Sequence, residues 1–271
     1  MLQLLQQRTK LSGQIGRMKR RYGAVIYVPE REHELVARLT RLSKGKLPAR
    51  VVAALYREIM SNSRAAQGQS PIGLLRASAP VVLPGSRAYF GECDQFSPQK
   101  TWPELARGIN TGALSLALLT GDDLISALGT RRRRSEFLSR LTVAGDFPPI
   151  SLSKATLAQR IFIVTPRGNG AIVKANRILI LIECKSSVNA IKSLLHSMSD
   201  FPIHAEQLPL RIAPARRGPA QGRLAVALVR LTLGRSMDAI HATGRLLAAC
   251  KSAGIPVSIL GTYPGTEAYG G

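Results

Sequence analysis

The stretch QRTKLSGQIGRMK (residues 7–19) decides how the first quarter of this chain folds. Apolar residues recur through and around it at helical spacing: Leu4, Leu11, Ile15 and Met18. This periodicity predicts one long amphipathic helix that runs to Arg21 and ends where Tyr22-Gly23 breaks the pattern.

Two basic residues lie on the apolar face of this helix. Arg8 and Lys19 are 11 residues apart, which is about three helical turns, so both share the face of Leu11 and Ile15. A cation on an apolar face favours a nearby carboxylate or an anionic ligand. Long basic side chains also extend around the edge of a core, and that alternative stays open.

Two more helices are expected before residue 68. Pro29 suits the first position of a helix whose stripe is Leu35, Val36, Leu39 and Leu42, with Gly45 as its stop. A third helix follows Pro48 and runs to about Gln67. Ser63 and Gln67 are four residues apart on it and extend its apolar face, and residues 67–71 form a linker.

The remaining chain divides into two mixed blocks. In block 72–168 we expect helices at 102–109 and 122–128, strands at 113–120 and 160–165, and a basic loop at Arg131–Arg134. In block 175–265 we expect strands at 177–184, 203–212, 224–231 and 256–260, with helices at 188–198 and 237–253. The order of the second block is βαββαβ, the split ferredoxin-like pattern.

Charge is the unusual global property. The chain has 38 Lys+Arg against 16 Asp+Glu, a formal net charge of +22. Such a surface attracts polyanions non-specifically. Only 5% of residues are aromatic, and neither RNP-like nor zinc-finger spacing occurs. A solvated basic surface and an anionic small-molecule substrate therefore remain alternatives to a nucleic-acid partner.

Other sequence features narrow the class of protein. The longest apolar runs fall far short of the roughly 20 residues that a membrane span needs, and the N-terminus lacks a signal peptide's apolar block. We therefore expect a cytoplasmic protein without a membrane partner. Cys93, Cys184 and Cys250 are widely spaced, so we expect neither a disulfide framework nor a metal site. We also expect no cofactor.

The helical block resembles a known enzyme family. QRTKLSGQIGRMK (7–19), VPERE (28–32) and REIMSNSRAAQ (57–67) are similar to the all-helical class of chorismate mutases, and more closely to the mutase domain fused to prephenate dehydratase in bacterial bifunctional enzymes. The resemblance covers nearly all of residues 1–67 and implies conversion of chorismate to prephenate in aromatic amino-acid biosynthesis.

The resemblance also implies roles for six residues. Arg8 holds a carboxylate of the dianionic substrate, and Lys19 and Gln67 donate towards the ether oxygen, on which negative charge grows. Glu32 accepts from the ring hydroxyl, and Arg31 and Ser63 complete the polar shell. Because three short helices bury little surface alone, we expect a homodimer through this domain.

Two departures from the family pattern count against full activity. The family's first helix is longer and sends an arginine into the partner's site, and this sequence, starting at Met1, has no matching residue. Val28 also replaces an acidic residue.

The two later blocks resemble the other parts of those bifunctional enzymes. RAYFG (87–91) and PELARGINTGAL (103–114) are similar to the first half of a prephenate dehydratase domain. QRIF (159–162) stands where that family has Thr-Arg-Phe, so Gln159 takes the place of the catalytic threonine. We expect this shortened region to lack dehydratase activity, and we interpret RGNGA (167–171) as a linker turn.

The third block resembles an ACT domain. ILGTYP (259–264) is similar to the close of the family's regulatory domain. The effector-binding motifs are represented weakly, by EQLP (206–209) and SSVNAI (186–191), which favours a structural or dimerising unit.

We therefore expect a multidomain α and α+β protein. Its parts are a helical chorismate mutase-like domain at 1–67, a dehydratase-like α/β region at 72–168 and an ACT-like domain at 175–265. The alternative is a non-catalytic relative that acts as a regulatory protein, or that binds RNA or a large assembly through its basic surface.

Overall fold

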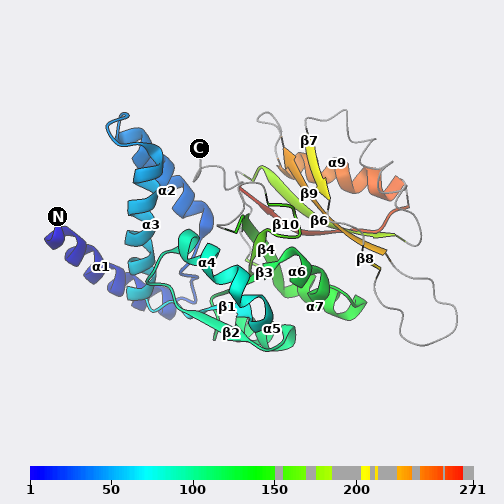
Figure 1. The fold of residues 1–271 in the computed structure, drawn as a ribbon, viewed down its shortest axis with the longest axis horizontal. Helices are drawn as coiled ribbons and strands as arrows, with labels where there is room; N and C mark the ends of the chain where they lie inside the picture. The colour runs from blue at the N-terminus through cyan, green and yellow to red at the C-terminus, as the bar shows by residue number, and fades with distance from the viewer. Residues whose placement is uncertain are drawn as a thin grey trace.

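The computed structural model describes residues 1–149, 155–168, 175–184, 203–207, 211–212, 225–233, 239–252 and 254–264. Three helices lie at one end of the molecule and an antiparallel sheet lies at the other, with a mixed α/β region between them (Figure 1). No helix among these residues is long and apolar enough to cross a membrane.

The three expected N-terminal helices are present. They are α1 (Leu2–Arg21), α2 (Pro29–Leu42) and α3 (Ala49–Ala66). Pro29 occupies the first turn of α2, where its missing N–H leaves no helical hydrogen bond unmade. Tyr27, in the connection before α2, packs with the core of the α/β region, its ring centroid 5.4 Å from that of Phe90. The helical end is thereby joined to the middle region.

The middle region is a sheet covered on both faces. Its elements are β1 (Ile72–Leu75), a 3-10 turn (Arg76–Ser78), α4 (Ala79–Phe90), β2 (Phe96–Gln99), α5 (Trp102–Thr111), β3 (Leu116–Thr120), α6 (Gly121–Ala127), α7 (Arg131–Arg140), β4 (Leu141–Phe147) and β5 (Ile161–Pro166). The strand order is β2-β1-β3-β5-β4, with β1, β2 and β3 parallel and β5 antiparallel to both neighbours. Leu116 and Leu118 of β3 join one core cluster, and Ala117 and Leu119 join the other. This burial on both faces explains the continuous apolar sequence of β3.

One expectation for this region was wrong. Residues Arg131–Arg134 form the first turn of helix α7 and are not a loop. Thr130 caps the helix by accepting from the Arg133 backbone N–H. Arg134 is buried and donates to the Leu128 carbonyl, while Phe137 packs in the core. The four consecutive arginines have no apolar period, so the sequence did not indicate the helix; its cap at Thr130 and its core residue Phe137 lie on either side of the run.

The last region is an antiparallel sheet. Its described elements are β6 (Arg177–Cys184), β7 (Ile203–Gln207), β8 (Arg211–Ile212), β9 (Ala225–Leu233), α9 (Ala239–Ser252) and β10 (Val257–Tyr263). The order is β10-β6-β9-β7, and β8 also pairs with β9. Within the span expected as one strand, 203–212, the structure describes two short strands, β7 and β8, and residues 208–210 between them lie outside the described residues. The helix expected at 188–198 and the turn at 167–171 lie wholly or partly outside the described residues.

A buried carboxylate joins the two sheets. Asp146 of β4 accepts from Arg160, from Arg177 at 3.1 Å and from Arg230 at 2.6 Å, and its side chain is fully buried. Burial would raise the pKa of Asp146, but the three guanidinium groups outweigh it and hold that pKa below its usual value. Nearby, Thr142 of β4 donates to the Leu260 carbonyl of β10. The antiparallel sheet is thus fixed to the middle region by both charge and backbone contacts.

Candidate active site

Helices α1, α2 and α3 line an open hollow of about 1080 Å³. All six residues singled out from the sequence line it: Arg8, Lys19, Arg31, Glu32, Ser63 and Gln67. Its lining also includes Arg38, Arg41 and Arg64, so that six basic side chains face two acidic ones. A hollow of this size and sign suits a small anionic ligand.

Helix α1 closely approaches the end of α3 where Gln67 lines the hollow. A Cβ added at Gly16 would lie only 2.5 Å from the Gln67 Cα, so this contact needs glycine. Arg20 of α1 donates to the Gln67 carbonyl at 2.5 Å. Together these contacts hold Gln67 against α1.

Glycine 16 has a matched neighbour for testing this contact. A Cβ at Gly13, on the same helix, would lie 3.6 Å from the nearest atom, the Ala66 carbonyl oxygen, which is ordinary contact. We expect Gly13→Ala to stabilise the protein by roughly 0.5–1 kcal/mol through helix propensity. Gly16→Ala should destabilise it by about 1–3 kcal/mol, because α1 must move away from Gln67. Urea unfolding of both variants measures the difference, and equal effects would contradict the proposed contact.

Polar side chains of α1 and α3 meet across the hollow. Arg8 Nε donates to Ser63 Oγ at 3.3 Å, and Ser63 Oγ donates to the Ile59 carbonyl at 2.8 Å. The Gln67 Oε1 atom is buried and has no hydrogen-bond partner among the described residues. An unpaired amide oxygen in a cavity is costly unless a ligand or water completes it.

Lys19 is half-buried near the end of α1. Its Nζ donates to the Ile26 carbonyl at 3.1 Å. Burial lowers the pKa of Lys19, and the nearby Arg31 lowers it further, while Glu32 acts in the opposite direction. Neither Lys19 nor Arg8 forms an ion pair with a carboxylate in the part of the chain that the structure describes. Both cations therefore remain available to an anion.

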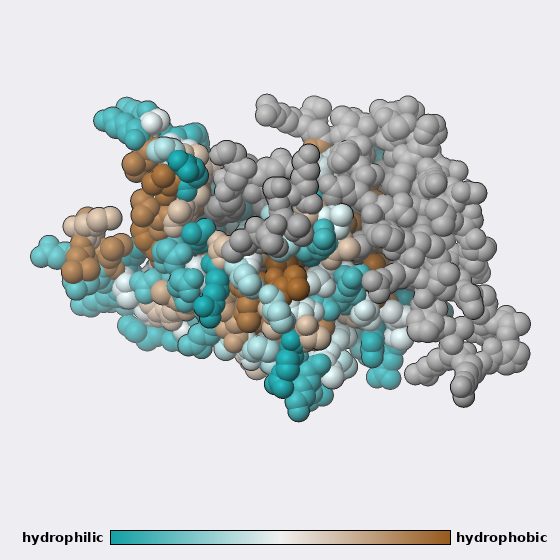
Figure 2. All heavy atoms as spheres, in the orientation of Figure 1, coloured by the Kyte–Doolittle hydropathy of each residue, from teal (hydrophilic) through white to brown (hydrophobic). Residues whose placement is uncertain are grey.

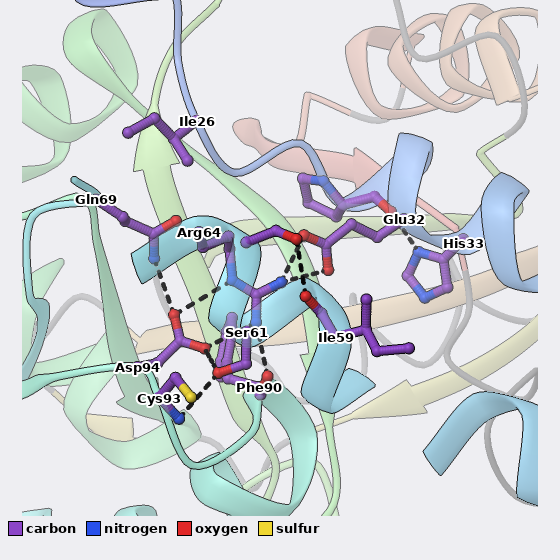
Figure 3. A network of polar contacts seen from close by, with 12 residues as sticks. Ile26, Glu32, His33, Ile59, Ser61, Arg64, Gln69, Phe90, Cys93 and Asp94 are labelled. Carbon is purple, nitrogen blue, oxygen red and sulfur yellow. Dashed lines mark hydrogen bonds and ion pairs between the residues drawn. The ribbon is translucent and has the colours of Figure 1, made fainter. Parts of the chain in front are cut away.

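Glu32, by contrast, is already paired. Arg64 Nη1 donates to its two carboxylate oxygens at 2.5 and 2.7 Å, and Figure 3 shows this guanidinium between Glu32 and Asp94. The pKa of Glu32 lies above its usual value, chiefly because of burial and also because of Asp94, although Arg64 acts in the opposite direction. The pairing leaves carboxylate lone pairs for a further donor, since an ionised carboxylate has about four acceptor sites.

Arg64 and Asp94 were not among the candidates from the sequence. Arg64 is 3% exposed and follows Ser63 on the buried side of α3. Its position next to the apolar stripe of α3 could have indicated that Arg64 is buried. A buried arginine requires carboxylate partners, so a search for them would have been justified. Asp94 lies in the loop after α4 and has no local pattern that would reveal it.

The comparisons with known proteins bear on this helical unit. The family model for chorismate mutase type II matches residues 1–68. Residues 1–68 form a chorismate mutase type II domain. A prephenate dehydratase-like region follows the mutase domain, as in bifunctional chorismate mutase/prephenate dehydratases, to which the chain is homologous.

Two such relatives show how far the similarity extends. The bifunctional enzyme of Aquifex aeolicus is 26% identical over 156 residues, which is 56% of this chain and 43% of that protein. The enzyme of Neisseria gonorrhoeae is 36% identical over 90 residues, 33% of this chain and 24% of that protein. The matched stretches thus cover less than half of each relative.

A solved structure described as GqqA, a novel type of quorum quenching acylases, covers 72% of this chain and 95% of its own. Its TM-score is 0.50 at 16% sequence identity. This likeness concerns the fold alone.

Proposed function

We propose that this chain is a chorismate mutase, which forms prephenate for phenylalanine and tyrosine biosynthesis. The observation that carries the proposal is the gathering of Arg8, Lys19, Arg31, Glu32, Ser63 and Gln67 around one hollow of the mutase domain. They come from three different helices.

The reaction needs few chemical groups. Chorismate is a dianion that rearranges without a covalent enzyme intermediate, and negative charge grows on its ether oxygen in the transition state. Fixed cations such as Arg8 and Arg31 hold the carboxylates, which places the reacting atoms close together. Lys19 and Gln67 donate to the ether oxygen, and Glu32 accepts from the ring hydroxyl. Donors fixed before the reaction stabilise the transition state without reorganising.

The direct test is an assay with chorismate and the full chain, without added metal or cofactor. We expect loss of chorismate absorbance with formation of prephenate, which acid converts to phenylpyruvate. A rate equal to that in buffer, from protein shown to be folded by circular dichroism, would refute the proposal.

We further propose that the middle region has lost dehydratase activity. Gln159 stands in the position of the family's catalytic threonine, and its Oε1 accepts from Thr156 N and Oγ1 within a turn, both at 3.0 Å. Phenylpyruvate formed from prephenate at neutral pH, above the spontaneous rate, would contradict this.

The chain divides, in this proposal, into a mutase domain at 1–67, the dehydratase-like region at 72–168 and an ACT-like domain at 175–265. The order β10-β6-β9-β7 supports the ACT-like assignment, because β6 and β9 are central and β10 and β7 lie at the edges; with β8 left aside, this is the order of a ferredoxin-like sheet. The packing of β4 against β10 favours a structural role for this domain.

We also propose a homodimer through the mutase domain. Apolar side chains of its helices are exposed, and Figure 2 shows them gathered at the helical end of the molecule. On α1 these are Leu4, Leu11, Ile15 and Met18, between 46% and 69% exposed. Apolar surface concentrated in this way marks an interface. Sedimentation of the full chain should give twice the monomer mass of 29.2 kDa.

The net charge of +22 supports only weak, non-specific binding of nucleic acid. Such binding should disappear steeply with added salt. Sequence-selective RNA binding near physiological ionic strength would favour the alternative of a non-catalytic binding protein.

A further inference from the structure

Arg64 connects the hollow to the α/β region. All five of its N–H groups have acceptors: Glu32 Oε1 and Oε2 from Nη1, the Phe90 carbonyl and Asp94 Oδ2 from Nη2 at 2.6 and 2.8 Å, and Asp94 Oδ1 from Nε at 3.2 Å. The guanidinium also lies over the rings of Tyr27 and Phe90. These contacts fix the orientation of the Arg64 guanidinium.

Asp94 is fixed as firmly as Arg64. Its side chain is 2% exposed and accepts from Ser61 Oγ at 2.7 Å and from Gln69 Nε2 at 3.2 Å. The loop that carries it presses on α3 at Gly91, where φ is +110° and a Cβ would lie 2.6 Å from the Ser61 Cβ. Figure 3 shows Asp94, Arg64 and Glu32 in one connected network.

The charges of this network do not cancel. Two carboxylates, Glu32 and Asp94, bind one guanidinium, that of Arg64. Its single positive charge therefore compensates each carboxylate only in part. When it is ionised, the Glu32 carboxylate is therefore only partly compensated by Arg64 and can still accept from a donor in the hollow. Its orientation is set by an arginine that Asp94 holds from the other side.

We propose that Asp94 is a positioning residue for the mutase site, which acts through Arg64 to set the orientation and the charge of Glu32. The α/β region thus takes part in the chemistry of the hollow, and a shift of the loop at 91–95 changes the hollow. The effect on turnover rests on the proposed mutase function, whereas the coupling of Asp94 to Glu32 does not.

The charges around Glu32 determine in which direction each substitution should shift its pKa. Arg64 of α3 and Lys19 of α1 lower the pKa of Glu32, and Asp94 raises it; Arg31, on α2 itself, lies near Lys19. Removing the charge of Asp94 therefore lowers the pKa of Glu32, and removing Arg64 raises it. A purely structural role would not move this pKa in opposite directions in the two variants.

The test compares Asp94→Asn, which keeps the shape of the side chain, with Arg64→Met in the full chain. Carbon-13 NMR of the side-chain carboxyls, with Glu32→Gln to assign the signal, follows the titration of Glu32 without requiring turnover. We expect the midpoint to move to lower pH in Asp94→Asn and to higher pH in Arg64→Met. An unchanged or raised midpoint in Asp94→Asn overturns the proposal, even if Arg64→Met fails to fold.

Activity provides the second measurement. The acid limb of the kcat/KM profile should move with the Glu32 midpoint, and Arg64→Met should lose roughly tenfold or more in kcat/KM, because displacement of a catalytic group lowers the rate steeply.

Asp123→Asn is the matched control, since Asp123 accepts from Ser78 and Thr120 in the α/β region and does not line the hollow. It should leave the Glu32 midpoint unchanged, and a shift as large as that of Asp94→Asn overturns the proposal. If the NMR shifts appear while every variant and the wild type are inactive on chorismate, the mutase function fails and the coupling stands.

Discussion

Replacing Lys19 by alanine should reduce chorismate mutase turnover roughly 100- to 1000-fold, which is the effect of removing one oxyanion donor from an active site. Lys19 is half-buried beside the hollow and is held by the Ile26 carbonyl. In the proposed mechanism, Lys19 donates to the departing ether oxygen, and that hydrogen bond strengthens as charge develops there. The loss should therefore appear mainly in kcat.

Lys10→Ala is the matched control for this variant. Lys10 lies on the same helix, is exposed and does not line the hollow. Its removal takes away the same charge and should leave turnover within about twofold of the wild type, as expected of a solvated surface charge. A Lys19→Ala protein that folds by circular dichroism and keeps near-normal turnover would show that the site is assigned wrongly.

The second large effect is expected from Gln67→Glu, and it should depend on pH. At neutral pH the introduced carboxylate repels the charge that develops on the ether oxygen, so turnover should fall roughly 100-fold, as for a lost donor. A protonated carboxyl can donate as the amide does, so turnover should recover on acidification. The buried position of the Gln67 amide oxygen should raise the pKa of the new carboxyl.

Gln14→Glu separates this effect from a general change of charge. Gln14 is exposed on α1 and lies outside the hollow, so the same added charge should not produce an acid recovery. Turnover is compared between pH 5 and 8 for both variants. Parallel pH profiles for Gln67→Glu, Gln14→Glu and the wild type would remove Gln67 from the site.

The helices and the lining of the hollow could be predicted because their signals are local. The apolar period fixed the extent of α1, and Pro29 marked the start of α2. The structure brings together the six candidate residues, although their roles in the reaction remain predictions. Sequence reasoning placed Arg8 and Lys19 on a face with Leu11 and Ile15, and these residues do line one surface.

The contacts between regions could not be predicted in the same way. Arg64 and Asp94 are 30 residues apart, and no period links them. Helix α7 was missed because its first turn is a run of arginines without an apolar residue. The two features that favour it, the cap at Thr130 and the core residue Phe137, lie on either side of this run. The sequence also could not predict that Leu4 and Met18 are exposed, because an apolar stripe has the same period whether it faces a core or a second chain.

The cluster around Asp146 makes tolerance to substitution unequal among its members. Exchange of Arg160 for an uncharged residue leaves the Asp146 carboxylate with Arg177 and Arg230. Exchange of Asp146 leaves three buried guanidinium groups without it, and breaking a buried ion pair from one side costs about 3–5 kcal/mol. Natural variants of this protein should therefore change their arginines here more freely than Asp146. Asp146 accepts from arginines of both regions, so it is the residue on which the attachment of the two sheets depends.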